Sequence, residues 1–237
     1  MTAEQAPVDD PELLRSILAN AEALLLDFDG PVCSVFAGFP AHLVAHQLRG
    51  VLADGGHDEL PAEIEKAEDP FDVLRYAAAL GRKEAQYVEA AMRAHEVEAV
   101  ATAHPTPGAH DLIAAWHPSR KLAVVSNNSD VAVTTYLHLH KLAIHVQCVS
   151  ARSGADLSML KPSPFLVLNA SDALGISPSR CLFVGDSLSD IHAARAAGAP
   201  VIGYANKPGK AEKFAEDGAL LTFTDMRALV DVVQAIL

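Results

Sequence analysis

The hydrophobic positions along the chain fall into short apolar runs that alternate with amphipathic segments. Three runs have the length and composition of buried strands: Ala23–Leu26, Lys121–Val125 and Cys181–Val184. Further helices are expected at 109–116, 130–139, 164–174 and 189–197, and further strands at 144–149, 200–204 and 219–223. Strands that alternate with helices predict a parallel sheet covered on both faces, and therefore an α/β fold.

Residues 34–104 have a different pattern, because strand-like runs disappear and helical periodicity takes over. The expected helices there are Ala41–Leu52, Pro61–Lys66, Phe71–Leu80 and Glu84–Ala103. The stretch His104–Gly108 contains two prolines and is a stiff segment that leads back to the alternating pattern. We therefore expect two domains: a core built from residues 1–33 and 105–237, and an inserted α-helical cap at 34–104.

Composition narrows the classes of partner. The 237 residues carry 18 lysines and arginines against 30 aspartates and glutamates, a net charge of −12, without a basic run. Binding to nucleic acid or to an anionic membrane surface needs concentrated positive charge, so neither partner is expected. Cys33, Cys148 and Cys181 fit neither a disulfide framework nor a metal site, and the first residues lack the basic and apolar regions of a signal peptide. We expect a cytoplasmic protein with reduced thiols.

Polar residues follow the three apolar runs directly. They are Asp27-Phe28-Asp29-Gly30, Ser126-Asn127-Asn128 and the stretch from Gly185-Asp186 to Asp190. Because the carboxyl ends of parallel strands meet at one edge of a sheet, we expect these side chains to lie together. A single ending has a simpler interpretation, since Asp also suits turns, but three endings in one chain favour a site. Lys161 lies between the second and third endings, in a loop kept out of a helix by Pro162 and Pro164.

These residue types suit phosphoryl chemistry. The carboxylates of Asp27 and Asp186 are ligands of the kind that Mg²⁺ prefers, and the cation would relieve the repulsion between close carboxylates. Ser126, the backbone N–H groups after it and Lys161 would supply hydrogen-bond donors and positive charge for a phosphate group. Phosphoryl transfer depends on positioning and charge neutralisation more than on covalent chemistry. The pattern therefore predicts a phosphate site that uses magnesium.

The four polar pieces, in this order, resemble the motifs of the haloacid dehalogenase-like hydrolase superfamily. The motifs are matched by Asp27–Val32, by Ser126-Asn127, by Lys161-Pro162 and by Gly185-Asp186-Ser187 with Asp190. The helical insertion resembles the cap of the subfamily that includes phosphoglycolate phosphatase and β-phosphoglucomutase. The resemblance covers almost the whole chain and implies a Rossmann-like core. The chain departs from the family's pattern at Pro31, where Thr is common.

The resemblance also implies roles for the acidic residues. Asp27 would be the nucleophile that forms an aspartyl-phosphate, and Asp29 would be the general acid and then the general base. Mg²⁺ would be held by the Asp27 carboxylate, the Asp29 backbone carbonyl and Asp186. Asp190 would orient Lys161 or a metal-bound water. True dehalogenases lack an acid at the position of Asp29, so the resemblance favours phosphate transfer.

The phosphate-binding residues follow from the same resemblance. Ser126 and Asn127 would bind the transferring phosphoryl group, and Lys161 would neutralise charge on it. We therefore expect a magnesium-dependent phosphatase that hydrolyses a small phosphorylated metabolite through an aspartyl-phosphate, as a monomer or a homodimer. Two alternatives stay open: a phosphomutase with the same core, and a non-catalytic protein that binds a ligand or a partner. The substrate would depend on the cap, where the sequence shows only helical pattern.

Overall fold

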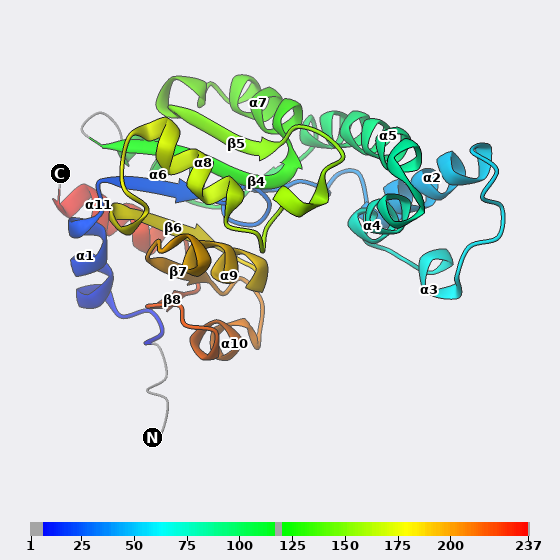
Figure 1. The fold of residues 1–237 in the computed structure, drawn as a ribbon. Helices are drawn as coiled ribbons and strands as arrows, with labels where there is room; N and C mark the ends of the chain where they lie inside the picture. Colours follow the sequence, from blue (N-terminus) through cyan, green and yellow to red (C-terminus); the bar gives the residue numbers. More distant parts are fainter. Residues whose placement is uncertain (1–6, 117–119, 237) are drawn as a thin grey trace.

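Six parallel strands form the central sheet, in the order β5-β4-β1-β6-β7-β8 (Figure 1). The computed structural model describes residues 7–116 and 120–236. The strands are β1 (Ala23–Leu26), β4 (Lys121–Ser129), β5 (Cys148–Arg152), β6 (Cys181–Gly185), β7 (Val201–Tyr204) and β8 (Thr222–Phe223). Leu26, the last residue of β1, pairs with Val124 of β4 and Val184 of β6. The predicted α/β fold with a parallel sheet is confirmed, and the three strands with polar endings are neighbours.

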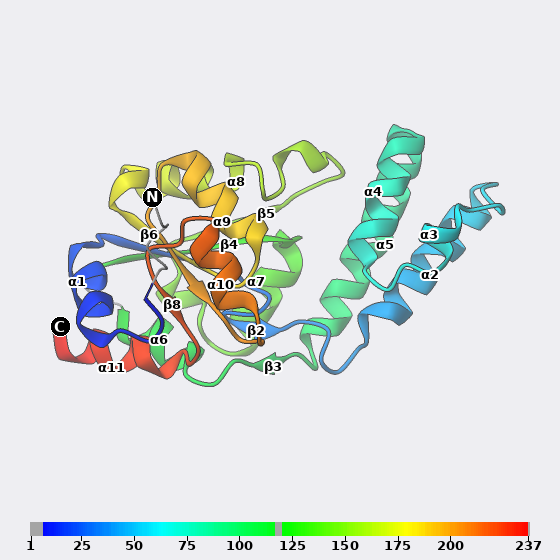
Figure 2. The ribbon, with the colours of Figure 1, turned by 90° about the horizontal axis from the view of Figure 1, so that it is seen from below.

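Helices cover both faces of the sheet, because successive side chains of a strand point to opposite faces. Leu24 and Leu26 belong to a core formed with α1, α6, α7 and α11, whereas Ala23 and Leu25 belong to a core formed with α8, α9 and α10. Figure 2 shows α6 and α11 on one side of the sheet and α8 and α9 on the other. The bounds are α1 Pro11–Asn20, α6 Ala109–Trp116, α7 Asp130–Leu139, α8 Phe165–Leu174, α9 Leu188–Ala197, α10 Lys210–Glu216 and α11 Arg227–Ile236.

The strand predicted at 144–149 is misplaced. The chain forms a short 3₁₀ helix, η1 (Ala143–His145), and then enters β5 at Cys148. Two residues of β5 that face the protein interior, Ser150 and Arg152, are polar, so the apolar run in the sequence ends before the strand does. Two further 3₁₀ helices are η2 (Leu157–Met159) and η3 (Pro178–Arg180).

The insertion between β1 and β4 is helical, as predicted. It contains α2 (Ala41–Asp54), α3 (Ala62–Glu65), α4 (Pro70–Leu80) and α5 (Arg82–Val100). These helices share an apolar core of their own, which includes Val44, Leu48, Val73, Leu74, Val88 and Met92. The segments at its two ends pair as a short antiparallel ladder of β2 (Cys33–Ser34) and β3 (His104–Pro105). The limits 34–104 for a cap domain stay a prediction.

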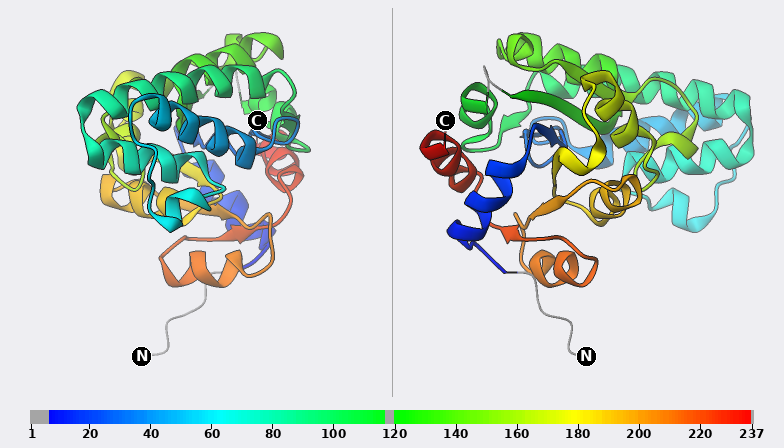
Figure 3. Two further views of the ribbon diagram at one scale, coloured as in Figure 1. Left: turned by 90° about the vertical axis from the view of Figure 1, so that its right-hand side faces the viewer. Right: turned by 60° about the vertical axis from the view of Figure 1, so that its left-hand side comes forward.

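Helix α5 reaches from the insertion to the sheet. Its carboxyl-terminal part packs against α7 and β4 (Figures 1 and 3). Figure 3 shows that the insertion lies past one end of the sheet, next to the carboxyl ends of the strands. Among the described residues, no helix has both the length and the apolar character needed to cross a bilayer.

Candidate active site

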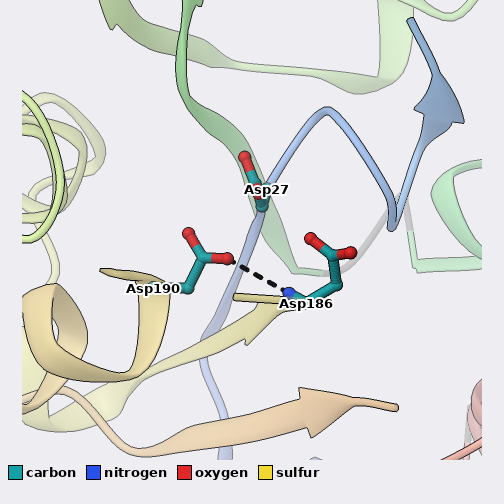
Figure 4. Close-up of side chains that lie close together, drawn as sticks. All are labelled: Asp27, Asp186 and Asp190. Carbon is teal, nitrogen blue, oxygen red and sulfur yellow. Dashed lines mark hydrogen bonds between the residues drawn. The ribbon is translucent and has the colours of Figure 1, made fainter. Parts of the chain in front are cut away.

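Three carboxylates meet at the carboxyl ends of the central strands (Figure 4). Asp27 follows β1, and its N–H donates to the Val184 carbonyl of β6 (2.9 Å). Asp186 follows β6, and Asp190 lies in the first turn of α9. One oxygen of each carboxylate lies within 4.8 Å of the others, and among the described residues no other group of three or more His, Cys, Asp or Glu side chains meets this condition. We call these three residues the carboxylate cluster.

Lys161 is the buried cation of this cluster. Its Nζ lies 2.7 Å from Asp27 Oδ1 and 2.5 Å from Asp190 Oδ1. The same ammonium donates to the Val125 carbonyl (3.2 Å). Burial alone would lower the pKa of Lys161, but the charges of Asp190 and Asp27 outweigh it and hold the pKa above its ordinary value. Lys161 therefore remains an ammonium.

One ammonium does not neutralise the cluster. Burial and then the charge of Asp190 raise the pKa of Asp27 well above its ordinary value, although Lys161 opposes both. A divalent cation bound here would favour the ionised carboxylates, and oxygen ligands of this type suit Mg²⁺. The residues present therefore fit the metal that the family resemblance implies.

Asp190 connects the cluster to the start of α9. Its Oδ2 accepts hydrogen bonds from the backbone N–H groups of Asp186 (3.1 Å) and Ser187 (3.0 Å) and from the Ser187 hydroxyl (2.7 Å). Ser187 in turn caps the helix, which completes a capping box. Asp190 thus contacts both the Asp186 backbone and the ammonium of Lys161, and its role in orienting Lys161 stays a prediction.

Asp29 lies beside the cluster, two residues after Asp27. Its Oδ1 accepts the N–H of Val35 (2.9 Å). The residue keeps an exposed surface, yet protein atoms displace enough water from its carboxyl group to raise the pKa to about 6, against the hydrogen bond from Val35 that lowers it. A carboxyl with this pKa is present in both protonation states near neutral pH, as a general acid and base requires.

Gly30 allows the chain to pass close to Asp186. Its φ of +107° is strained for residues with a side chain, and a Cβ at this position would lie 2.4 Å from Asp186 Cγ. Its carbonyl accepts the hydroxyl hydrogen of Thr106 (2.5 Å). Thr106 follows the return strand β3, so the end of the insertion helps to hold the loop that carries Asp29.

The order of these pieces and their meeting at one sheet edge match a known family. A model described as "haloacid dehalogenase-like hydrolase" matches residues 21–198. The chain belongs to the haloacid dehalogenase-like hydrolases.

Relatives of this hydrolase include several phosphoglycolate phosphatases. The enzyme of Xylella fastidiosa (strain Temecula1) is 28% identical over 198 residues, which cover 78% of each chain. That of Pseudomonas fluorescens (strain Pf0-1) is 29% identical over 184 residues, 77% of this chain and 60% of the relative. Both are phosphatases by name, and no single substrate follows from identities at this level.

Solved structures share the fold. CbbY from Rhodobacter sphaeroides, solved in complex with phosphate, superposes with a TM-score of 0.65 at 23% identity, over 87% of this chain and 95% of CbbY. A putative phosphoglycolate phosphatase from Lactobacillus plantarum superposes with a TM-score of 0.63 at 19% identity, over 90% of this chain and 99% of the other. The insertion and the sheet of this hydrolase thus form an arrangement already known in the family.

The predicted phosphate residues Ser126 and Asn127 lie at the end of β4. The hydroxyl of Ser126 is buried and bonded to Asn128. The Asn127 amide makes two reciprocal hydrogen bonds with the backbone of Lys161, at 3.1 and 2.8 Å. In this hydrolase the Asn127 side chain therefore holds the Lys161 segment in place, and the role of Asn127 in phosphate binding stays a prediction.

Two residues that contact Asp186 were missed by sequence reasoning. Lys210 Nζ donates to Asp186 Oδ2 (2.7 Å), to its backbone carbonyl (2.5 Å) and to Asn206 Oδ1 (2.7 Å). Asn206 Nδ2 donates to the same Asp186 Oδ2 (3.0 Å). Asn206 follows β7, the next strand of the sheet. The rule that located the other site residues, a polar ending after an apolar strand, could have found it.

A cavity of about 850 Å³ lies between the helices α4 and α5 and the segment 151–166. Its lining reaches Leu160, next to Lys161, and it does not include the carboxylates of the cluster. The cavity therefore borders the Lys161 segment without containing the carboxylate cluster.

Proposed function

We propose that this hydrolase is a magnesium-dependent phosphatase that acts on a small phosphorylated metabolite through an aspartyl-phosphate on Asp27. The observation that carries the proposal is the place of Asp27, at the end of the central strand, paired with Lys161 at 2.7 Å inside a cluster suited to a divalent cation. The relatives named phosphoglycolate phosphatase support a small phosphorylated acid as the first substrate to test.

The reaction divides into two transfers. In the first, the Asp27 carboxylate attacks phosphorus; its O–P bond forms as the bond to the leaving oxygen breaks, and Asp29 protonates that oxygen. In the second, water attacks the aspartyl-phosphate while Asp29 accepts its proton, and phosphate leaves with Asp27 restored. Mg²⁺ held by Asp27, Asp186 and the Asp29 carbonyl would supply positive charge opposite the transferring group.

Residues at and after the end of the apolar run of β4 would bind the transferring phosphoryl group. The hydroxyl of Ser126, the backbone N–H after it and the ammonium of Lys161 are the proposed donors. Asp190 keeps that ammonium directed at Asp27, since it pairs with Lys161 at 2.5 Å. Charge-assisted hydrogen bonds of this kind stabilise the charge that develops on the phosphoryl oxygens.

We retain the cytoplasm as the proposed location and a monomer or homodimer as the proposed state. The three cysteines are free thiols, which suits a reducing compartment.

The test is phosphate release from p-nitrophenyl phosphate and a panel that includes 2-phosphoglycolate, with Mg²⁺ and with EDTA. Wild type is compared with Asp27→Asn, and Asp231→Asn on the exposed face of α11 is the matched control. We expect release that requires both Mg²⁺ and Asp27, a loss of roughly 10⁴-fold or more in Asp27→Asn, and no change in Asp231→Asn.

Full activity of Asp27→Asn would remove the nucleophile assignment. If wild type transferred phosphate from Asp27 back to a sugar phosphate and released none to water, the mutase alternative would hold. Binding of ligands without either reaction would indicate a non-catalytic protein.

A further inference from the structure

A second buried charge cluster joins α5 to the end of β5. Arg152, the last residue of β5, pairs with Glu89 and Glu96 of α5, each at 2.5 Å. Arg93 of α5 also pairs with Glu89 (2.9 Å). Arg152, Glu89 and Glu96 are only 2%, 4% and 0% exposed. We call these four residues the α5 charge network; its two arginines and two glutamates carry no net formal charge.

The network contacts β4 where the pairing of β4 with β5 is irregular. Ser126 pairs with Ala151 of β5, but Ser129 pairs with the very next residue, Arg152. Residues 127–128 are therefore extra on the β4 side. Such a bulge leaves backbone groups without partners in the strand ladder, at the point where the proposed phosphate site begins.

The network contacts the segment 127–129 at three points. Arg152 Nε donates to the Asn127 carbonyl (3.0 Å). Glu96 accepts one hydrogen bond from Asn128 Nδ2 (3.1 Å) and another from the Ser129 N–H (2.9 Å). All three residues of the bulged segment are thus held by charged side chains, one of which comes from a helix of the insertion.

Stability alone does not account for this arrangement. Well-packed apolar side chains of similar volume stabilise a fold as much as a buried ion pair does, or more. Charged hydrogen bonds from a planar guanidinium and a carboxylate instead fix direction and distance. Asn128 of the same segment bonds to the hydroxyl of Ser126, and the Asn127 amide holds Lys161. A shift of the bulge would therefore move two of the proposed phosphate-binding groups together.

We propose that Glu96 and Arg152 are positioning residues for phosphoryl binding, which hold the 127–129 segment so that the proposed donors Ser126 and Lys161 face the same phosphate. This inference rests on the proposed phosphatase function. It adds that Glu96 of α5 determines the position of the phosphate-binding groups without contacting the phosphate. Glu89 has a different role, since it pairs with the two arginines and has no bond to the segment in the network described above.

The test compares Glu96→Gln with Glu89→Gln. Each variant removes one buried carboxylate of α5 that pairs with Arg152. Only Glu96 also contacts the bulge. The readouts are the inhibition constant of inorganic phosphate, calorimetric titration with Mg²⁺, kcat and KM for p-nitrophenyl phosphate, and the melting temperature. We expect Glu96→Gln to weaken phosphate about tenfold and Glu89→Gln to change it less than about twofold, with similar melting temperatures and unchanged Mg²⁺ affinity in both.

Arg152→Lys is the second variant. It keeps the charge that pairs with the glutamates but lacks the Nε that donates to Asn127, so phosphate should bind more weakly while the fold persists. Equal phosphate constants for Glu96→Gln and Glu89→Gln would overturn the inference, and so would unchanged phosphate binding in Arg152→Lys. An active, Asp27-dependent wild type with either result would leave the proposed function standing. A wild type without phosphatase activity would overturn both.

Discussion

The carboxylate cluster and the α5 charge network are both buried groups of charges, but they differ in balance. The cluster sets three carboxylates against the single buried ammonium of Lys161, and Lys210 reaches only Asp186 from the side. The network sets two glutamates against two arginines. The carboxylate cluster can therefore bind a further cation, whereas in the α5 charge network the arginines already neutralise the glutamates.

The difference has a structural origin. The cluster lies at the open edge of the sheet, where Asp186 is partly exposed and Asp29 keeps an exposed surface. The network is closed between α5 and β5, where Glu96 is fully buried. A surplus of buried like charge is costly, and its presence at an accessible edge supports the proposal that the cluster is the reactive site. The predictions below test that contrast.

After Asp27→Asn, the largest effect is expected on turnover in Asp29→Asn. Loss of a general acid and base should lower kcat by about 10²–10⁴-fold, while Mg²⁺ binding is kept because the proposed ligand is the backbone carbonyl. Steady-state kinetics and calorimetric titration with Mg²⁺ measure the two quantities on one preparation. A variant that had lost Mg²⁺ would contradict the backbone role.

Arg152→Met should give the largest loss of stability. It leaves Glu89 and Glu96 buried without their shared cation, and removal of one partner from a buried pair costs about 3–5 kcal/mol in the free energy of unfolding. Urea denaturation measures it. Arg75→Met is the control, because Arg75 pairs with Asp72 on an exposed surface and such pairs contribute about 0–1 kcal/mol. Equal losses of unfolding free energy in the two variants would show that the network contributes no more to stability than an exposed ion pair does.

Added Mg²⁺ should stabilise the protein through the unbalanced cluster alone. At a concentration 100 times its dissociation constant, a ligand that binds only the folded state adds about 2.7 kcal/mol. We expect Mg²⁺ to stabilise wild type and Glu89→Gln but not Asp186→Asn. Thermal melts with and without the metal measure the difference. A gain that survived in Asp186→Asn would place the cation elsewhere.

The smallest effect is a pH dependence of stability in EDTA. The pKa of Asp29 is about 6 in the folded state, above the ordinary value of 3.8, so the folded state binds this proton more tightly than the unfolded state does. Its contribution to stability is full below about pH 4 and is lost as the pH rises through about 6. The stability of wild type relative to Asp29→Asn should fall over this range and then level off. A flat difference would mean that Asp29 is not desolvated.

Sequence reasoning predicted most of the sheet, and it placed the residues of the candidate site at one edge of that sheet. The endings of β1 and β6 were located because apolar runs stop abruptly there, whereas β4 continues past its apolar run to Ser129. The end of β5 was predicted too early because Ser150 and Arg152 are buried polar residues, whose partners come from α8 and α5. Apolar periodicity cannot reveal a strand whose interior positions are satisfied by distant charges.

Residues that hold other site residues were the hardest to predict. Thr106 and Lys210 bond to the Gly30 and Asp186 backbones from 76 and 24 residues away. Neither belongs to a local pattern, and a lysine near the start of a helix is ordinarily a surface residue. The two hydrogen bonds between the Asn127 side chain and the Lys161 backbone are a further contact that the sequence did not predict.

The sequence by itself determined the α/β class, the helical insertion and the set of acidic and basic residues at one edge of the sheet. It could do so because side-chain periodicity and strand endings are local properties of the chain. Tertiary structure alone decided which carboxylates share Lys161, why the pKa values of Asp27 and Asp29 rise, and that α5 holds the bulge after Ser126. Those features depend on distances and burial between residues far apart in the chain, and no local pattern encodes them.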